Sequence, residues 1–251
     1  MSSPRFLIDP SSVAGDRACL TGTEAHHARR VLRLAAGDTI TLLDGCGTRH
    51  LARIERITPE RVETVILKSQ QDPSPRAQVH LCQGVLKGQK MDLVCQKATE
   101  LGATAIWPFI SDHCARHGEQ EDRPDRWRRI ALEACKQCDR ALPPEIHNII
   151  PLSTLLSRLP DNTLKLMLWE EETEQPFGAI FKGNSRPDAA TLLIGPEGGF
   201  ATTEVTMARD AGFITTSVGR LILRAETAAL AALSIAQYEL GNLAPFKGDT
   251  R

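Results

Sequence analysis

The feature that most constrains this chain is a short apolar run that ends in a glycine-rich turn, Leu192-Leu193-Ile194-Gly195-Pro196-Glu197-Gly198-Gly199-Phe200. Three consecutive apolar residues are typical of a strand covered on both faces, as in a parallel α/β sheet. The glycines permit positive φ or close backbone approach, and Thr202 to Glu204 predict a following helix with a threonine cap. Open α/β sheets bind small molecules beyond the carboxyl ends of their strands, so this turn is a candidate ligand site. An ordinary tight connection has the same glycine spacing and stays open as an alternative.

After residue 76, short apolar runs typical of strands alternate with segments of helical periodicity. This alternation predicts a parallel sheet. Strands are expected at 79–85, 103–107, 145–150, 165–169, 191–194 and 213–218, and helices at 91–101, 125–140 and 225–241. The earlier part of the chain, from Arg5 to about Lys68, has short alternating segments and a hairpin signal at Asp44-Gly45, with helical spacing at 24–34. A small β-rich barrel or sandwich is therefore expected there.

A polar segment with two prolines, residues 70–76, separates the β-rich pattern from the alternating strand–helix pattern and is the predicted linker. We therefore expect two domains, over residues 1–72 and 73–251.

Composition excludes several classes of protein. The chain has 251 residues, of which 41% are hydrophobic and 24% charged, and its net charge is −1. A global positive field is absent, so a nucleic-acid partner would have to be bound by local basic patches. No apolar run approaches the ~18 residues of a membrane span, and the N-terminus lacks the apolar core of a signal peptide. A cytoplasmic protein without a membrane partner is expected.

Seven cysteines, an odd number, do not suggest a disulfide framework. A zinc site is the alternative, because His113, Cys114 and His117 precede Cys135 and Cys138. Residues 131–140 have a helical pattern, whereas structural zinc sites usually take a C-x-x-C pair from a tight turn. We therefore expect no metal and reduced thiols.

Two segments carry a resemblance to a known family. They are the GPEGGF turn at 195–200 and Gly219-Arg220-Leu221-Ile222-Leu223-Arg224-Ala225-Glu226-Thr227-Ala228. Further matching blocks, in the same order, are Arg5-Phe6, His26-His27 with Val31-Leu32-Arg33, and residues 87–92, 96–102 and 133–138. With these blocks the chain resembles the RsmE-type 16S ribosomal RNA uridine methyltransferases of the SPOUT superfamily. It departs from that pattern at Leu221, where the family often has arginine; here Arg220 stands one place earlier.

The resemblance implies an α/β fold of SPOUT type, a parallel-sheet domain tied in a deep trefoil knot, preceded by a small PUA-like β-barrel that binds RNA. General rules on chain connections would reject a knot. The resemblance also implies a homodimer with its pocket near the subunit interface.

The resemblance further implies S-adenosylmethionine as methyl donor, and as acceptor N3 of a uridine in 16S rRNA of the small ribosomal subunit. Loop backbone groups would hold the adenine edges, and apolar side chains would form the pocket floor. The residues that match the donor pocket are Leu168, Ile194, Gly195, Pro196, Glu197, Gly198, Gly199, Val218, Gly219 and Leu223.

Uridine N3 carries a proton and is not nucleophilic until that proton leaves. Arg224 is the candidate stabiliser of the developing anion and Glu226 the candidate base, both catalytic roles. An arginine–glutamate pair that only holds a helix start is the structural alternative.

RNA phosphates would be bound by local cations, each of which has a solvated surface charge as its alternative. The candidates are Arg5, Arg29, Arg30, Arg33, Lys87 and Lys90.

Three other functions stay open. One is a SPOUT methyltransferase that acts on tRNA or another rRNA site. Another is a noncatalytic RNA-binding or ribosome-assembly factor. The third, a different nucleotide-binding α/β enzyme, is disfavoured because neither G-x-G-x-x-G after the first strand nor a phosphate loop is present.

Overall fold

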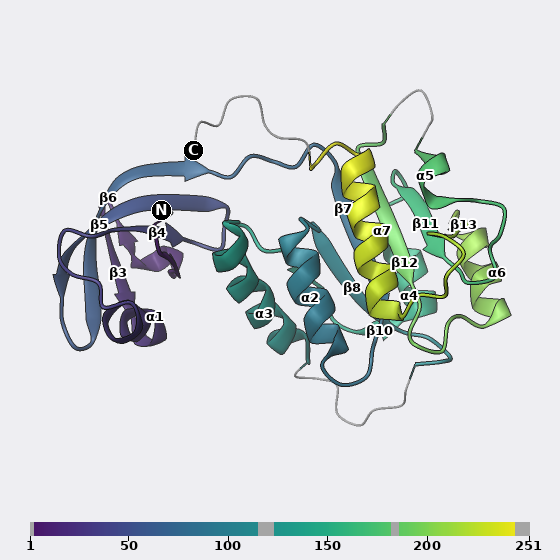
Figure 1. Ribbon diagram of the computed structural model, residues 1–251, viewed down its shortest axis with the longest axis horizontal. Helices are drawn as coiled ribbons and strands as arrows, with labels where there is room; N and C mark the ends of the chain where they lie inside the picture. Colours follow the sequence, from purple (N-terminus) through teal and green to yellow (C-terminus); the bar gives the residue numbers. More distant parts are fainter. Residues whose placement is uncertain (1–2, 115–122, 182–185, 244–251) are drawn as a thin grey trace. The chain divides into compact units, whose positions relative to one another are not determined.

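The computed structural model describes residues 3–114, 123–181 and 186–243 (Figure 1). The chain divides into two compact units. The first comprises residues 1–74 and 132–143, and the second comprises residues 75–131 and 144–251.

The first unit contains a six-stranded sheet in the order β1-β4-β5-β6-β3-β2. The strands are β1 (Arg5–Leu7), β2 (Val13–Ala14), β3 (Arg17–Thr21), β4 (Thr39–Leu43), β5 (Thr48–Ile57) and β6 (Arg61–Gln71). Neighbours pair antiparallel except β1 and β4, which pair parallel. The expected hairpin joins β4 to β5, where Asp44 Oδ1 accepts the N–H groups of Cys46 and Thr48, both at 2.8 Å. This confirms the β-rich N-terminal region.

The helical pattern at 24–34 forms α1 (Gly22–His26), which continues as a π-helical turn, η2 (His27–Val31). Its Ala25 and Ala28 pack into the core of this unit beside Phe6, Leu20 and Ile40. A short 3-10 turn, η1 (Pro10–Ser12), lies between β1 and β2. The apolar residues of these segments therefore share one small core.

The second unit is built on a seven-stranded parallel sheet in the order β10-β8-β7-β12-β11-β13, with β9 beside β8. The strands are β7 (Gln78–Gly84), β8 (Ala105–Ile110), β9 (Glu145–Ile146), β10 (Ile150–Pro151), β11 (Leu164–Leu168), β12 (Ala189–Ile194) and β13 (Ile214–Thr216). The helices are α2 (Lys90–Glu100), α3 (Arg123–Cys138), α4 (Leu152–Arg158), α5 (Phe177–Ile180), α6 (Thr202–Asp210) and α7 (Ala225–Glu239). Residues 132–138 of α3 count with the first unit.

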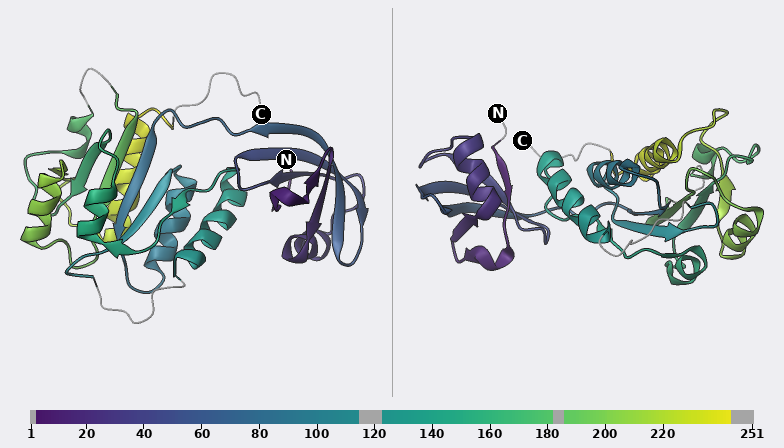
Figure 2. Two further views of the ribbon diagram at one scale, coloured as in Figure 1. Left: turned by 180° about the vertical axis from the view of Figure 1, so that it is seen from behind. Right: turned by 90° about the horizontal axis from the view of Figure 1, so that it is seen from below.

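Helices cover both faces of this sheet, with α2 and α7 on one side and α4 and α6 on the other (Figure 2). Each face has its own core: Leu81 and Leu192 point toward α7, whereas Cys82 and Leu193 pack with Leu155 of α4. Because residues on both faces are buried, these strands are mostly apolar and do not alternate between apolar and polar residues.

Near the C-terminus the chain returns from the edge of the sheet to its middle. It leaves β13 at one edge of the sheet and returns through residues 217–224, which we call the return loop, to α7 over β7 and β12. On the way, Ser217 O accepts the N–H of Phe177 at 2.9 Å, and α5 packs against α7. The start of the return loop therefore lies against the connection between β11 and β12.

Three expectations need correction. The strand expected at 145–150 is two short strands, because His147 between them turns to stack on Trp107 with ring centroids 3.4 Å apart. The cap of α6 is Ala201 rather than a threonine, since Glu204 Oε2 reaches back to accept its N–H at 2.9 Å. The strand expected at 103–107 begins at Ala105, after Thr104 has bonded to Val79 of β7. Helices α4 and α5 are short and were not expected.

Among the described residues, no helix has the length and apolar character needed to cross a membrane.

Candidate functional site

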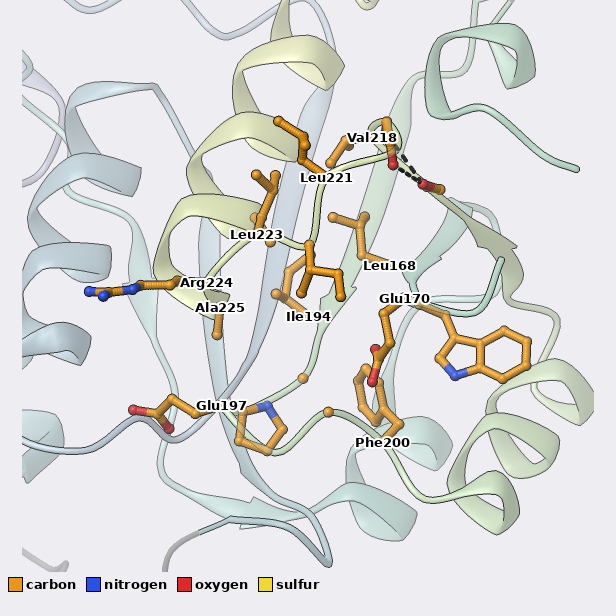
Figure 3. Close-up of a pocket in the computed structure, with 18 of the residues that line it drawn as sticks. Leu168, Glu170, Ile194, Glu197, Phe200, Val218, Leu221, Leu223, Arg224 and Ala225 are labelled. Carbon is orange, nitrogen blue, oxygen red and sulfur yellow. Dashed lines mark hydrogen bonds between the residues drawn. The ribbon is translucent and has the colours of Figure 1, made fainter. Parts of the chain in front are cut away.

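A cavity of about 570 Å³ lies beyond the carboxyl ends of β11, β12 and β13, within the second unit (Figure 3). Its size falls within the range of about 300–1,000 Å³ typical of small-molecule sites. Three chain segments form its walls: residues 168–170, residues 194–200 without Gly198, and residues 216–225. Lys90 and Ala228 complete the lining.

The floor of the cavity is apolar. Leu168, Ile194, Val218 and Leu223 converge on it from two strand ends and the return loop (Figure 3). These are the four apolar residues that the sequence predicted for a donor pocket. A flat, largely apolar ligand group with polar edges would fit between them.

The GPEGGF loop (residues 195–200) packs against the carboxyl end of β7. Buried Gln83 donates its Nε2–H to Gly195 O at 3.1 Å. A Cβ at Gly84 would lie 2.6 Å from Pro196 N, so only glycine lets the loop cross the end of β7 this closely. The neighbouring His113 Nδ1 donates to Gly198 O at 2.9 Å. Strand β7 therefore fixes the backbone of this loop.

The return loop makes fewer contacts with the rest of the protein than the GPEGGF loop does. Leu221 and Ile222 are 81% and 90% exposed. Within the described part of the chain, the backbone groups of residues 221–223 make no hydrogen bond to protein. Gly219 has φ +138°, a conformation that favours glycine. The loop thus presents free N–H and C=O groups at the cavity, where a ligand can use them.

Charge gathers at one side of the cavity. Lys90 Nζ lies 2.9 Å from Glu197 Oε1 and 3.9 Å from Glu226 Oε2, and the N–H of Lys87 also donates to Glu197. Burial acts to raise the pKa of Glu197, but the hydrogen bonds from Lys90 and from backbone N–H groups outweigh it and lower that pKa. Glu197 is therefore held as an anion that ties the GPEGGF loop to α2.

The two candidate catalytic residues differ in position. Arg224 lines the cavity at the start of α7, but its side chain is exposed and extends away from the apolar floor (Figure 3). Glu226 is not part of the lining; its side chain is 13% exposed, and Oε2 is buried without a hydrogen bond. Both roles stay predictions, as do those of the donor-pocket residues.

Nine of the ten residues predicted for the donor pocket line the cavity, and Gly198 does not. A Cβ at Gly198 would lie 2.8 Å from His113 Cβ, so this glycine permits packing on His113 behind the loop.

The residues predicted to bind RNA fall into three groups. Arg29, Arg30 and Arg33 lie together in and after η2, where Arg29 Nε is buried without a hydrogen-bond partner. Arg5 is engaged by Asp139 at 3.1 Å and donates to the carbonyls of Lys136 and Gln137, which gives it a structural task.

Lys87 and Lys90 form the third group, beside the cavity.

Sequence reasoning missed several lining residues. Trp169 and Glu170 directly follow β11, and a carboxylate just past a buried strand is the signal that could have identified them. Phe200, Thr216, Ser217 and Arg220 lie within or next to the matched motifs and were passed over. Gln83 and Gly84 carry no motif, and only the packing of β7 under the loop identifies them.

The described residues contain no group of three or more His, Cys, Asp and Glu side chains able to hold a metal ion. The zinc alternative named five residues, of which His117 lies outside the described part of the chain. No disulfide joins the seven cysteines, all of which lie in the described part of the chain, and burial raises the pKa of Cys135 to about 12.

Comparisons with known proteins agree with this geometry. The sequence model of an RNA methyltransferase domain matches residues 72–237, and that of an RNA methyltransferase PUA domain matches residues 20–67. Ribosomal RNA small subunit methyltransferase E of Bacillus subtilis is 30% identical to this chain over 88% of this chain and 89% of its own length.

Solved structures are similar over nearly the whole chain. The ribosomal RNA small subunit methyltransferase E of Neisseria gonorrhoeae, bound to S-adenosyl methionine, has a TM-score of 0.83 at 32% identity and covers 94% of this chain and 97% of its own. A Legionella pneumophila protein solved with the cofactor SAM has a TM-score of 0.80 at 28% identity, covering 95% and 98%. These similarities confirm the expected fold class, a SPOUT-type α/β domain with a small N-terminal PUA-like domain.

Proposed function

The chain belongs to the ribosomal RNA small subunit methyltransferase E family, and we propose that it methylates N3 of a uridine in 16S rRNA with S-adenosylmethionine as donor. The observation that carries this proposal is the cavity between the GPEGGF loop and the return loop, which the two family motifs line together.

The residues present fit this donor. An adenine ring needs an apolar slot with hydrogen-bonding groups at its rim, and the floor of Leu168, Ile194, Val218 and Leu223 supplies the slot. The free backbone groups of residues 221–223 supply the rim. When bound, S-adenosylmethionine supplies a methyl group already activated on a sulfonium, so the protein contributes mainly by positioning.

The acceptor needs a group that takes the N3 proton. Glu226 Oε2 is a buried carboxylate oxygen without a hydrogen-bond partner, which suits a proton acceptor. Lys90, at 3.9 Å, and Arg224, at the start of α7, supply positive charge for the anion that develops on the base. A base-paired N3 is inaccessible, so the target uridine must be unpaired or flipped out.

RNA binding belongs to both units in this proposal. Arg29, Arg30 and Arg33 bind phosphates from an N-terminal PUA-like domain over residues 1–72. Lys87 and Lys90 do the same beside the cavity of the methyltransferase domain, residues 73–251. A ribosomal substrate also implies a cytoplasmic reaction.

A homodimer is part of the proposal. Leu221, Ile222 and Tyr238 are large apolar or aromatic side chains, all more than two-thirds exposed, on the return loop and α7. Exposed apolar side chains on neighbouring segments are typical of a subunit interface. Sedimentation analysis should give the mass of two chains, and Tyr238→Lys should shift the equilibrium toward monomer; a wild-type monomer at all concentrations would refute the dimer.

The reaction is tested by methyl transfer from labelled S-adenosylmethionine. Small subunits that lack the modification, naked 16S rRNA and bulk tRNA are compared, and the labelled nucleoside is identified by mass spectrometry. We expect 3-methyluridine in 16S rRNA. Label only in tRNA would overturn the substrate, and no label together with no donor binding would favour a noncatalytic RNA-binding factor.

A further inference from the structure

Glu170 lines the cavity and belongs to neither of the two family motifs. It follows β11 by two residues, and its carboxylate points toward the cavity and the ring of Phe200 (Figure 3). The other lining carboxylate, Glu197, is engaged by Lys90 and a backbone N–H. Among the lining residues that the structure describes, Glu170 is the acidic side chain left without a hydrogen bond or ion pair.

The segment that carries Glu170 is firmly held. Trp169 N–H donates to Thr216 O at 3.1 Å, and the Trp169 ring lies 5.2 Å below the Arg209 guanidinium. Glu172 accepts the Thr215 hydroxyl at 2.7 Å and the N–H of Glu174 at 2.9 Å. The backbone on both sides of Glu170 is thus fixed, while its own carboxylate keeps all its acceptor capacity.

Gly199 leaves the room that this carboxylate occupies. It has φ +68°, and a Cβ at this position would overlap Glu170 Oε1. The carboxylate therefore lies against the backbone of the GPEGGF loop, only five residues beyond Ile194 of the apolar floor. A polar group held next to an adenine slot is placed for the part of a nucleoside attached directly to the base.

We propose that Glu170 accepts hydrogen bonds from the vicinal ribose hydroxyls of the methyl donor. The inference rests on the proposed donor and adds the residue that recognises its sugar. A carboxylate has two acceptor oxygens, which match two neighbouring hydroxyl donors. Acidic residues near the carboxyl ends of parallel strands bind ribose hydroxyls in the same way in other α/β folds.

Calorimetric titration of the full chain tests this with two ligands, S-adenosylhomocysteine and 5′-methylthioadenosine. The second ligand keeps the ribose and lacks the amino-acid part. Glu170→Ala should weaken both ligands equally, by roughly tenfold to a hundredfold, because hydrogen bonds to a charged group are lost. The 2′-deoxy form of 5′-methylthioadenosine should bind the wild type more weakly than the ribose form does. Its affinity should fall little further in Glu170→Ala.

Glu171→Ala is the matched control, because it removes the same charge from the next residue, which does not line the cavity. It should bind both ligands as the wild type does, and thermal unfolding checks that both variants fold. Weakening of S-adenosylhomocysteine alone would assign the carboxylate to the amino-acid ammonium and overturn the inference. Unchanged binding of both ligands to Glu170→Ala would overturn it too, with the proposed function intact. A wild type that binds neither ligand would instead overturn the proposed function.

Discussion

The GPEGGF loop and the return loop bound the same cavity but are built in opposite ways. The first is pinned by Gln83 and Lys90 and rests on Gly84. The second has exposed side chains at Leu221 and Ile222 and backbone groups without partners in the described structure. The difference indicates a division of labour: the pinned loop sets the shape of the cavity, and the open loop keeps its hydrogen-bonding groups for the ligand.

The largest expected effect comes from forcing the pinned loop off its support. Gly84→Ala would place a Cβ 2.6 Å from Pro196 N and 2.8 Å from its Cδ, and neither can move without shifting the loop. We expect a loss of about 3 kcal/mol in the free energy of unfolding, measured in urea. Gly178→Ala is the control, because nothing lies within 4 Å of a Cβ there, and it should be neutral. Equal stability of the two variants would show that the loop is not pinned by β7.

A smaller loss is expected from removing the polar support. Gln83→Met keeps a similar volume but leaves Gly195 O without its buried donor. The expected cost is about 2 kcal/mol, with weaker binding of S-adenosylhomocysteine in calorimetry. Gln237→Met removes a similar bond, from a buried amide to Leu101 O at 2.8 Å, at a residue that does not line the cavity. It should lose stability without losing ligand affinity; a similar affinity loss in both would deny Gln83 any special role at the site.

Lys90→Met should have a smaller effect on stability, under about 1 kcal/mol, since the pair with Glu197 is partly exposed. The pKa of Glu197 is lowered in the folded chain, so its stabilising contribution is present above its ordinary value of 4.5 and is lost as pH falls through the lower folded value. The stability difference between wild type and variant should therefore shrink in acid. Lys97→Met, which breaks the similarly exposed pair with Glu100, is the control and should leave ligand binding unchanged.

The smallest effect is expected in the open loop. Ile222→Ser replaces a side chain that is 90% exposed, so the stability of the monomeric chain should change by no more than about 0.5 kcal/mol. Thermal unfolding at low protein concentration measures this. A destabilisation as large as that of Gln83→Met would mean that the return loop is also part of the packed structure.

The same contrast explains what the sequence could predict. Short, largely apolar segments predicted β7, β11 and β12, because helices cover both faces of the sheet to which they belong. Residue type also predicted the apolar floor, since Ile194 and Leu168 end such strands. Family motifs added the two loops, whose residues are contiguous in sequence.

What the sequence did not predict depends on contacts between distant segments. Glycine inside a strand has many explanations, and only the crossing of Pro196 over Gly84 distinguishes this one. Glu170 lies in a segment rich in acidic residues, and the fold alone distinguishes it from its neighbour Glu171, which does not line the cavity. The short helices α4 and α5 have too few turns for periodicity to reveal them.

Hydrogen exchange with and without S-adenosylhomocysteine tests the division of labour most directly. The amide protons of Leu221, Ile222 and Leu223 should exchange rapidly in the free chain and slow down when the ligand binds. Gly199, whose N–H already donates to Pro196 O at 3.1 Å, should be protected in both states. Ligand binding without new protection at residues 221–223 would contradict this division of labour, because the backbone of the return loop would then not hydrogen-bond the donor.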